Sequence, residues 1–236
     1  MSRLQSNIIH KRDRKPVRTS ALVKLSLNID PETVLANPLF GELVDKDELA
    51  ELKQEYKRLP VHLASMRINH GLYKFFHDGV RVKRSRRGEV VLVLQNPDNE
   101  ILIHTKGKYP DGIYRLLTGG IKYHETIFNG FYREFDEETG LLAQFVQLLG
   151  IVMYDFQYLQ YNLPFVSYIF KASVDATPPR PKDFSEDITD FQWIPVKELK
   201  RIIRELESIT NEWRDWGVMR AVAHRVVLQT QTHEPV

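Results

Sequence analysis

The spacing of apolar residues changes near Gly88, and this change is the strongest constraint that the 236-residue chain places on its fold. Before Gly88, apolar residues recur mainly every three or four positions, as on one face of a helix. After it, residues 89–94 (EVVLVL) and 101–105 (ILIHT) have the composition of strands and flank the turn residues 96–99, so we expect a hairpin. Strands and helices then alternate irregularly, which predicts a mixed α/β fold.

The remaining elements are expected from the same patterns. Further strands are predicted at 114–118, 144–154, 165–174 and 190–194. Further helices are predicted at 126–139, 196–206 and 211–228.

The part of the chain before Gly88 is expected to be mostly helical. Residues 1–20 are basic and polar, which favours a flexible arm, and residues 21–29 alternate as in a short strand. A helix is predicted after Asp45, which supplies an acidic first turn. A second helix is predicted from four residues at helical spacing: Leu63, Met66, His70 and Tyr73. We therefore divide the chain into an arm (1–20), a mostly helical extension (21–87) and a domain that ends in a helix (88–236).

Composition narrows the possible functions. The chain has no Cys, which excludes disulfides, thiolate metal sites and cysteine nucleophiles. No stretch approaches the roughly 18 to 20 apolar residues that span a bilayer, and the N-terminus lacks the apolar segment of a secretory signal, so a cytoplasmic location is expected. Residues 1–88 hold 18 Lys/Arg and 10 Asp/Glu, a balance of +8, which leaves −6 for the rest. The basic half can contact phosphates, or it can pair with the acidic half of its own chain.

A glycine pair followed by a glutamate-rich helix is the segment with the clearest chemistry. Gly119 and Gly120 leave a predicted strand, where the backbone can approach a ligand closely. Three glutamates of the helix fall within about 100° of arc on one face: Glu134, Glu137 and Glu138. Apolar residues recur every four positions on another face of the same predicted helix: Ile127, Phe131 and Phe135. A divalent cation would relieve the repulsion between the carboxylates, and oxygen ligands favour Mg²⁺ or Mn²⁺. A solvated charged face is the alternative.

This segment resembles the signature of the Nudix hydrolase family. The signature fixes nine positions over 23 residues, and the chain matches each with the required spacing: Gly119, Glu125, Arg133, Glu134, Phe135, Glu137, Glu138, Gly140 and Leu141. The likeness extends over roughly 88–206 and leaves residues 1–87 outside it. It implies an α/β/α sandwich and the hydrolysis, with Mg²⁺ or Mn²⁺, of a pyrophosphate bond in a nucleoside diphosphate linked to another group.

The resemblance also implies roles for individual residues. Metal ligands would be the three glutamates and the carbonyl of one glycine: Glu134, Glu137, Glu138 and Gly119. The catalytic group would comprise Glu134, Arg133 and Glu137; any of the three glutamates could be the general base, and we favour Glu134. Arg133 would orient a neighbouring carboxylate. Glu125 would contribute to the metal network or stabilise the loop, and Gly120 would be a supporting residue.

Substrate-binding residues are less defined by the sequence. Lys106 on the second predicted strand and Glu186 in a later loop are candidates, although Lys106 also fits a solvated hairpin. Relatives add a carboxylate from that later loop, for which Glu186 and Asp187 are placed and Asp183 competes. Tyr158 is a candidate for stacking on a base, with packing as the alternative. The short sequence features of the ADP-ribose and NADH hydrolases are not evident, so the substrate is left open.

A different class of function rests on the basic run 81–87 (RVKRSRR). Such a run beside a helical module can bind nucleic acid, which would make the protein a regulator, or the domain can act as a nucleotide sensor. No nucleic-acid-binding signature accompanies it, and a solvated linker is the alternative. A homodimer formed through the extension and an extension that covers the active site are both compatible with the sequence.

Overall fold

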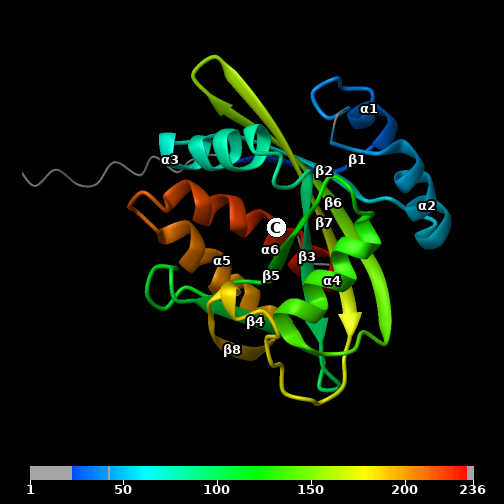
Figure 1. Cartoon of the computed structure of the whole chain (residues 1–236), viewed down its shortest axis with the longest axis vertical. Coiled ribbons are helices and arrows are strands. Elements are labelled where there is room, and N and C mark those ends of the chain that lie inside the picture. The colour runs from blue at the N-terminus through cyan, green and yellow to red at the C-terminus, as the bar shows by residue number, and fades with distance from the viewer. Residues whose placement is uncertain (1–22, 42, 233–236) are drawn as a thin grey trace, which may run out of the picture.

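The structure, a computed structural model, describes residues 23–41 and 43–232 (Figure 1). The arm predicted over residues 1–20 lies outside this range. Within it, none of the helices is long and apolar enough to cross a membrane.

A mixed sheet forms the centre of the described chain, with eight strands in that part of it. Seven run in the order β1-β2-β6-β7-β3-β4-β8, and β5 pairs with β3. Their bounds are β1 Lys24–Ile29, β2 Val61–Arg67, β3 Gly88–Gln95, β4 Glu100–Lys106, β5 Leu117–Ile121, β6 Phe145–Tyr158, β7 Tyr161–Ser173 and β8 Ile188–Pro195. The pairs β2–β6 and β3–β7 are parallel and the others are antiparallel.

Helices cover both faces of this sheet. Their bounds are α1 Pro31–Leu35, α2 Lys46–Tyr56, α3 His70–Lys74, α4 Ile127–Thr139, α5 Leu199–Ser208 and α6 Arg214–Thr232, with a π-helix η1 (Phe75–Val82) and 3₁₀ turns η2 (Phe184–Glu186) and η3 (Val196–Glu198). Apolar residues of α2 and α4 pack on one face, and those of η1, α5 and α6 pack on the other. The three-layer α/β/α arrangement expected from the sequence is therefore confirmed (Figure 1).

Strand β3 explains why its sequence is an unbroken apolar run. Its side chains alternate between the two cores: Val90, Leu92 and Leu94 pack under α4, whereas Val91 and Val93 pack on the α6 side. A strand that is covered on both faces has no solvent side, so alternation of apolar and polar residues is lost.

The predicted hairpin between residues 89–94 and 101–105 is only partly correct. The turn is present, since Asn96 N–H donates to Glu100 O at 3.0 Å, but β3 and β4 pair at a single position, Gln95 with Ile101. Beyond it the strands separate, because β3 is paired with β7 and β5 while β4 pairs with β8.

The predicted helix through Leu63 and Met66 is wrong, because residues 61–67 form β2. This strand lies between β1 and β6 and pairs with β6 over seven positions. Both of its faces are partly covered, so its apolar residues do not alternate cleanly, and their spacing resembled a helix. Helix α3 begins only at His70, after Asn69, whose side chain caps Leu72 N–H at 2.9 Å.

The extension is joined to the rest of the chain by a partly buried ion pair as well as by the sheet. Arg87 Nη2 donates to Glu48 Oε1 of α2 at 2.8 Å and to Glu125 O at 2.9 Å. Glu48 also accepts from the first amide of α4, Ile127 N, at 2.9 Å. A carboxylate at this end of a helix interacts favourably with its dipole. The N-terminus of α4 is thus held by a residue that is 79 positions earlier. The division at residue 87 stays a prediction.

Candidate metal centre

Two consecutive glycines of β5 lie beside α4. Gly119 and Gly120 are consecutive on the strand and therefore face opposite sides. A Cβ at Gly119 would lie 2.0 Å from Cγ of Glu134, and a Cβ at Gly120 would lie 2.9 Å from Cζ of Arg86. Only a residue without a side chain allows Glu134 to lie across the strand at this point.

Helix α4 is positioned by its ends and by its apolar face. Thr126 caps its start by accepting from Asn129 N at 3.1 Å, and Gly140, with φ 63°, ends it in the left-handed region. The predicted apolar residues are buried in the core: Ile127, Phe131 and Phe135. Because that face is fixed against the sheet, the direction in which the glutamates project is fixed too.

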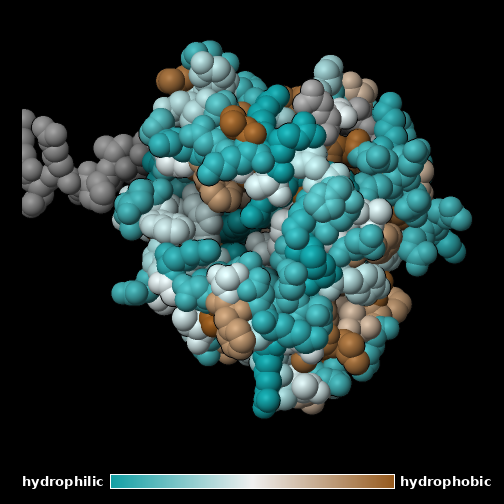
Figure 2. Space-filling model, in the orientation of Figure 1, coloured by the Kyte–Doolittle hydropathy of each residue, from teal (hydrophilic) through white to brown (hydrophobic). Residues whose placement is uncertain are grey.

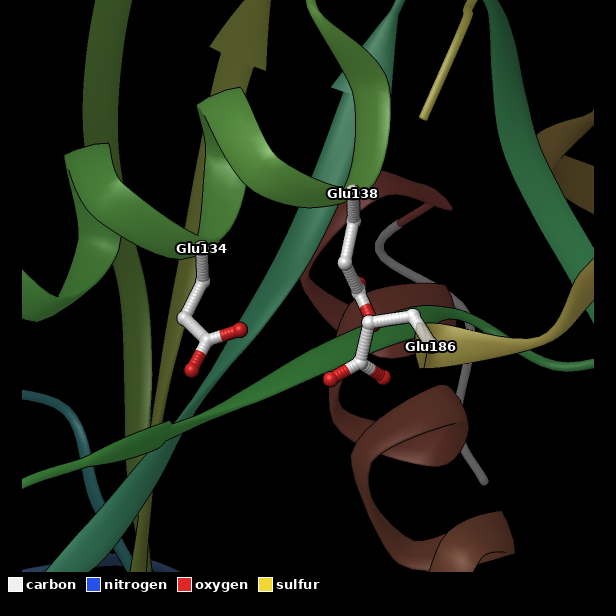
Figure 3. A group of neighbouring side chains, drawn as sticks. All are labelled: Glu134, Glu138 and Glu186. Atoms are coloured by element: carbon white, nitrogen blue, oxygen red, sulfur yellow. The ribbon is translucent and has the colours of Figure 1, made fainter. Parts of the chain in front are cut away.

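Three carboxylates meet at the side of this helix. Glu134, Glu138 and Glu186 each offer an oxygen, and these atoms lie within 4.8 Å of one another. Glu134 and Glu138 extend from successive turns of α4, and Glu186 approaches from η2 (Figure 3). The side chains of Glu138 and Glu134 are 0% and 9% exposed, whereas that of Glu186 is 33% exposed, so the group is open on the side of Glu186.

The loop before η2 brings Glu186 to the helix. Three of its amides donate to carbonyls in the last turn of α4: Arg180 N to Thr139 O at 2.7 Å, and Lys182 N and Asp183 N to Glu137 O at 2.9 and 3.1 Å. These carbonyls have no partner within the helix, and the loop satisfies them. Asp183 caps Ser185 N at 2.8 Å and Asp187 packs at Gly107, so of the three acidic candidates in this loop Glu186 joins the group.

Arg133 connects the loop between β5 and α4 to two of the signature glutamates. Its guanidinium donates to both oxygens of Glu125, at 2.6 and 3.0 Å, and to Gly120 O at 2.7 Å. It also donates to Glu134 at 2.8 Å and to Glu137 at 2.9 Å. Burial raises the pKa of Glu125, but these bonds outweigh it and the pKa lies below its ordinary value.

Glu137 is paired with Arg133 and is separated from the other carboxylates by that contact. Its side chain is 37% exposed and is paired with Arg133, and it is not one of the three whose oxygens converge. Residues 134 and 138 are one helical turn apart and share a direction more closely than 137 does. The structure thus brings together Glu134, Glu138 and Glu186, supported by Gly119, Gly120, Glu125 and Arg133.

Lys106 lies inside the group and not on a solvated hairpin. Its side chain is 4% exposed, and Nζ donates to Glu138 Oε1 at 2.9 Å and to Glu186 Oε2. Burial raises the pKa of Glu138 to about 7 although Lys106 opposes the shift. Burial alone would lower the pKa of Lys106, but Glu138 outweighs it and the pKa is raised, so the ammonium stays charged.

The group fits a hard divalent cation. Among the described residues it offers three carboxylates and no nitrogen or sulfur ligand. Carboxylate oxygens are the donors that Mg²⁺ and Mn²⁺ prefer. Glu138 Oε2 is buried and has no hydrogen-bond partner in the described part of the chain. Such an orphaned carboxylate oxygen is costly unless a cation or a water satisfies it.

Two buried basic residues near Lys106, His104 and Arg115, were not recognised as a group from the sequence. His104 is fully buried on β4 and faces Arg115 across an isolated bridge; burial, and then Arg115, hold its pKa well below the ordinary value. Arg115 Nε donates to Tyr109 Oη at 3.0 Å. The sequence did offer one signal of this group: Arg115 stands directly before the apolar residues Leu116 and Leu117. A charged residue beside such a run is seldom buried unless it is paired.

Tyr158 is not brought to the carboxylates. Its ring stacks on Tyr73 with centroids 4.3 Å apart, and its hydroxyl lies 3.0 Å from His70 Nδ1, at the junction of α3 with the β6–β7 hairpin. The packing alternative therefore describes its contacts.

The basic run 81–87 is used largely within the chain. Arg87 is buried against Glu48, Arg86 lies over Gly120, and the guanidinium of Arg84 stands 4.2 Å from the ring centroid of Tyr123.

The face of the molecule that shows β5 and α6 in Figure 1 is hollowed near its centre, and the floor of the hollow is hydrophilic (Figure 2).

A family of known proteins matches more than half of the chain. Residues 85–216 match the NUDIX domain family. Nudix hydrolase 6 of Arabidopsis thaliana is 29% identical over 114 residues, which are 48% of this chain and 37% of that protein, so the chain spans well under two thirds of this relative. The chain is also similar to a solved MutT structure from a study of the Aliivibrio salmonicida and Vibrio cholerae proteins (18% identity, 58% of this chain, 96% of that chain, TM-score 0.37). A second similar structure is the NUDIX domain of Shewanella oneidensis NrtR complexed with ADP ribose (15% identity, 66% of this chain, 97% of that chain, TM-score 0.40).

Proposed function

The chain belongs to the NUDIX domain family, since the match covers more than half of its length, and from this premise we propose its reaction. We propose that it is a pyrophosphohydrolase that uses Mg²⁺ or Mn²⁺ to cleave a nucleoside diphosphate linked to another group. The observation that carries the proposal is the convergence of three carboxylates on α4 and η2, with one buried oxygen left without a partner.

Glu134, Glu138 and Glu186 would hold the cation. When bound, such a cation polarises phosphoryl oxygens and lowers the pKa of an attacking water. We therefore place Glu186 among the ligands, in addition to its earlier candidacy for substrate binding, and give Glu137 a supporting position beside Arg133. The carbonyl of Gly119 remains a candidate ligand.

The other residues orient the group and bind substrate. Arg133 fixes Glu134 with a hydrogen bond of 2.8 Å, which keeps that carboxylate over Gly119. Glu134 is our candidate for the general base, and Lys106, the cation next to Glu138, is our candidate for contact with substrate phosphate. Tyr158 stays a candidate for stacking on a base.

The test is a substrate panel assayed with Mg²⁺ and with Mn²⁺. It contains nucleoside triphosphates, ADP-ribose, nucleotide sugars, dinucleoside polyphosphates and capped RNA, and product release is measured. We expect one class to be cleaved far faster than the others, only with metal, and Glu138→Gln to abolish the reaction. Asp136→Asn is the matched control, because Asp136 is an exposed carboxylate of the same helix, paired with Lys182. Turnover that survives Glu138→Gln or EDTA would contradict the proposal.

The base is tested by comparing Glu134→Gln with Glu137→Gln. General base catalysis contributes about 10²- to 10⁴-fold, so Glu134→Gln should lower kcat by that factor and remove the acidic limb of its pH profile. A larger loss with Glu137→Gln would move the role to Glu137.

The alternative function, a nucleic-acid-binding or nucleotide-sensing regulator, has no observation in its favour. It predicts salt-sensitive binding that weakens when Arg84 and Arg86 are neutralised. A homodimer and a cytoplasmic location stay predictions, to be checked by light scattering and by fractionation.

A further inference from the structure

Lys106 and a divalent cation would compete for the same carboxylates. The two residues that accept hydrogen bonds from Nζ of Lys106, Glu138 and Glu186, are two of the three whose oxygens converge. An ammonium and a divalent cation that share ligands a few ångströms apart repel each other strongly where water is largely excluded. The two cannot both occupy the centre of this group.

The side chain of Lys106 can leave while its backbone stays in place. Lys106 is the last residue of β4, whose pairing with β8 extends to the match of Lys106 with Ile188. The next residue is also tied, since Gly107 N donates to Asp187 O at 3.0 Å. The four-carbon stem of lysine is flexible, so the ammonium can move several ångströms by rotation alone.

We propose that Lys106 is a displaceable counter-ion of the metal site, an inference that rests on the proposed function. It neutralises Glu138 and Glu186 until a divalent cation binds, and the released ammonium is then available to phosphate oxygens of the substrate. The consequence is that metal binds weakly without substrate, because it must first displace a cation that is already part of the chain. Lys106 thus acts first through Glu138 and Glu186, and it contacts the substrate only after the cation has displaced it.

The experiment measures Mn²⁺ binding by titration calorimetry in the absence of any substrate. We expect Lys106→Met to bind Mn²⁺ about tenfold more tightly than the wild type, within the usual 5- to 150-fold range of coupling between two sites. Lys106→Arg keeps the positive charge and should keep the weak affinity. Lys182→Met is the matched control, because Lys182 pairs with an exposed carboxylate of the same helix, Asp136, at 2.5 Å.

Each outcome decides the matter. Equal or weaker Mn²⁺ binding by Lys106→Met overturns the counter-ion role and leaves the proposed function standing. If neither the wild type nor the variant binds Mn²⁺, the proposed function fails and this inference fails with it. Thermal unfolding gives the second readout: Lys106→Met should melt lower than the wild type in EDTA and gain more from Mn²⁺. A variant that folds only with Mn²⁺ supports the proposal, and one that is unfolded with and without Mn²⁺ assigns Lys106 to structure alone.

Discussion

Glu134 crosses β5 directly over Gly119, so closely that a Cβ at Gly119 would lie 2.4 Å from Cβ of Glu134. Rotation of the side chain could move Cγ and Cδ of Glu134, but its Cβ is fixed by the backbone of α4, so this clash cannot be relieved by a change of rotamer. Helix α4 can therefore take this position beside β5 only if residue 119 is a glycine.

Gly119→Ala should separate α4 from β5 and displace Glu134. A displacement of about 1 Å in a catalytic group can cost about 100-fold in rate, so we expect a loss of at least that size in kcat/KM together with weaker Mn²⁺ binding. Gly120→Ala is the matched comparison. Its Cβ would meet only the guanidinium of Arg86, the free end of a flexible side chain, and its effect should be much smaller. Equal effects of the two substitutions would contradict this reading of the contact.

Arg133→Lys should be far from conservative. The guanidinium bonds Glu125, Glu134, Glu137 and Gly120 O at once, and a lysine ammonium cannot reproduce that planar fork. Loss of a residue that orients metal ligands typically costs about 10- to 100-fold, which we expect in both activity and Mn²⁺ affinity. Arg201→Lys serves as control, because Arg201 also bonds two glutamates but is exposed. A full retention of activity by Arg133→Lys would remove the orienting role.

The stability of the protein should fall in acid because of buried histidines, of which His224 is the best defined. Leu116 N donates to His224 Nε2 at 3.0 Å and Nδ1 lies 2.8 Å from Arg220 O, so the ring is neutral with its hydrogen on Nδ1. Burial lowers the pKa of His224 to about 3 from 6.5. The unfolded chain takes up a proton below pH 6.5 and the folded one does not, so this contribution to stability is present above pH 6.5 and is lost as the pH falls.

The measurement is the free energy of unfolding in urea between pH 7 and pH 4. For His224 alone the loss is at most about 1.4 kcal/mol per pH unit below 6.5. His224→Gln cannot titrate and should show a shallower decline than the wild type. Parallel curves for the two proteins would mean that the ring is not held neutral.

The extension should be required for folding of the rest of the chain. Removing residues 1–87 would expose the edge of β6, which β2 covers over seven positions, and would uncover Phe156 and Phe165. Phe76 packs on both of these rings, with centroids 4.5 and 4.8 Å away. We expect residues 88–236 alone to aggregate or to melt at a clearly lower temperature. Removing only residues 1–20 should leave the melting temperature unchanged, and a stable, active fragment 88–236 would instead favour an independent domain.

What could be predicted from the sequence is what is encoded locally. Helix α4 carries its apolar face, its glutamates and the glycine that follows it within a short segment, and these were recognised. The capping role of Thr126 was not recognised. Strand β2 was mistaken for a helix because its burial depends on β1 and β6, which no local pattern shows. The contact of Lys106 with Glu138 joins residues 32 positions apart, and that of Lys106 with Glu186 joins residues 80 apart. The sequence placed each near the site but could not show that they meet.

The docking of residues 180–183 on the end of α4 also limits how this loop can change during evolution. Insertions between Val174 and Arg180 would lengthen a stretch that precedes the anchored amides, and these would keep their bonds to Thr139 and Glu137. An insertion between Asp183 and Glu186 falls after the anchor and would carry Glu186 out of register with Glu138. Length variation among homologues of this chain should therefore concentrate on the first half of the loop.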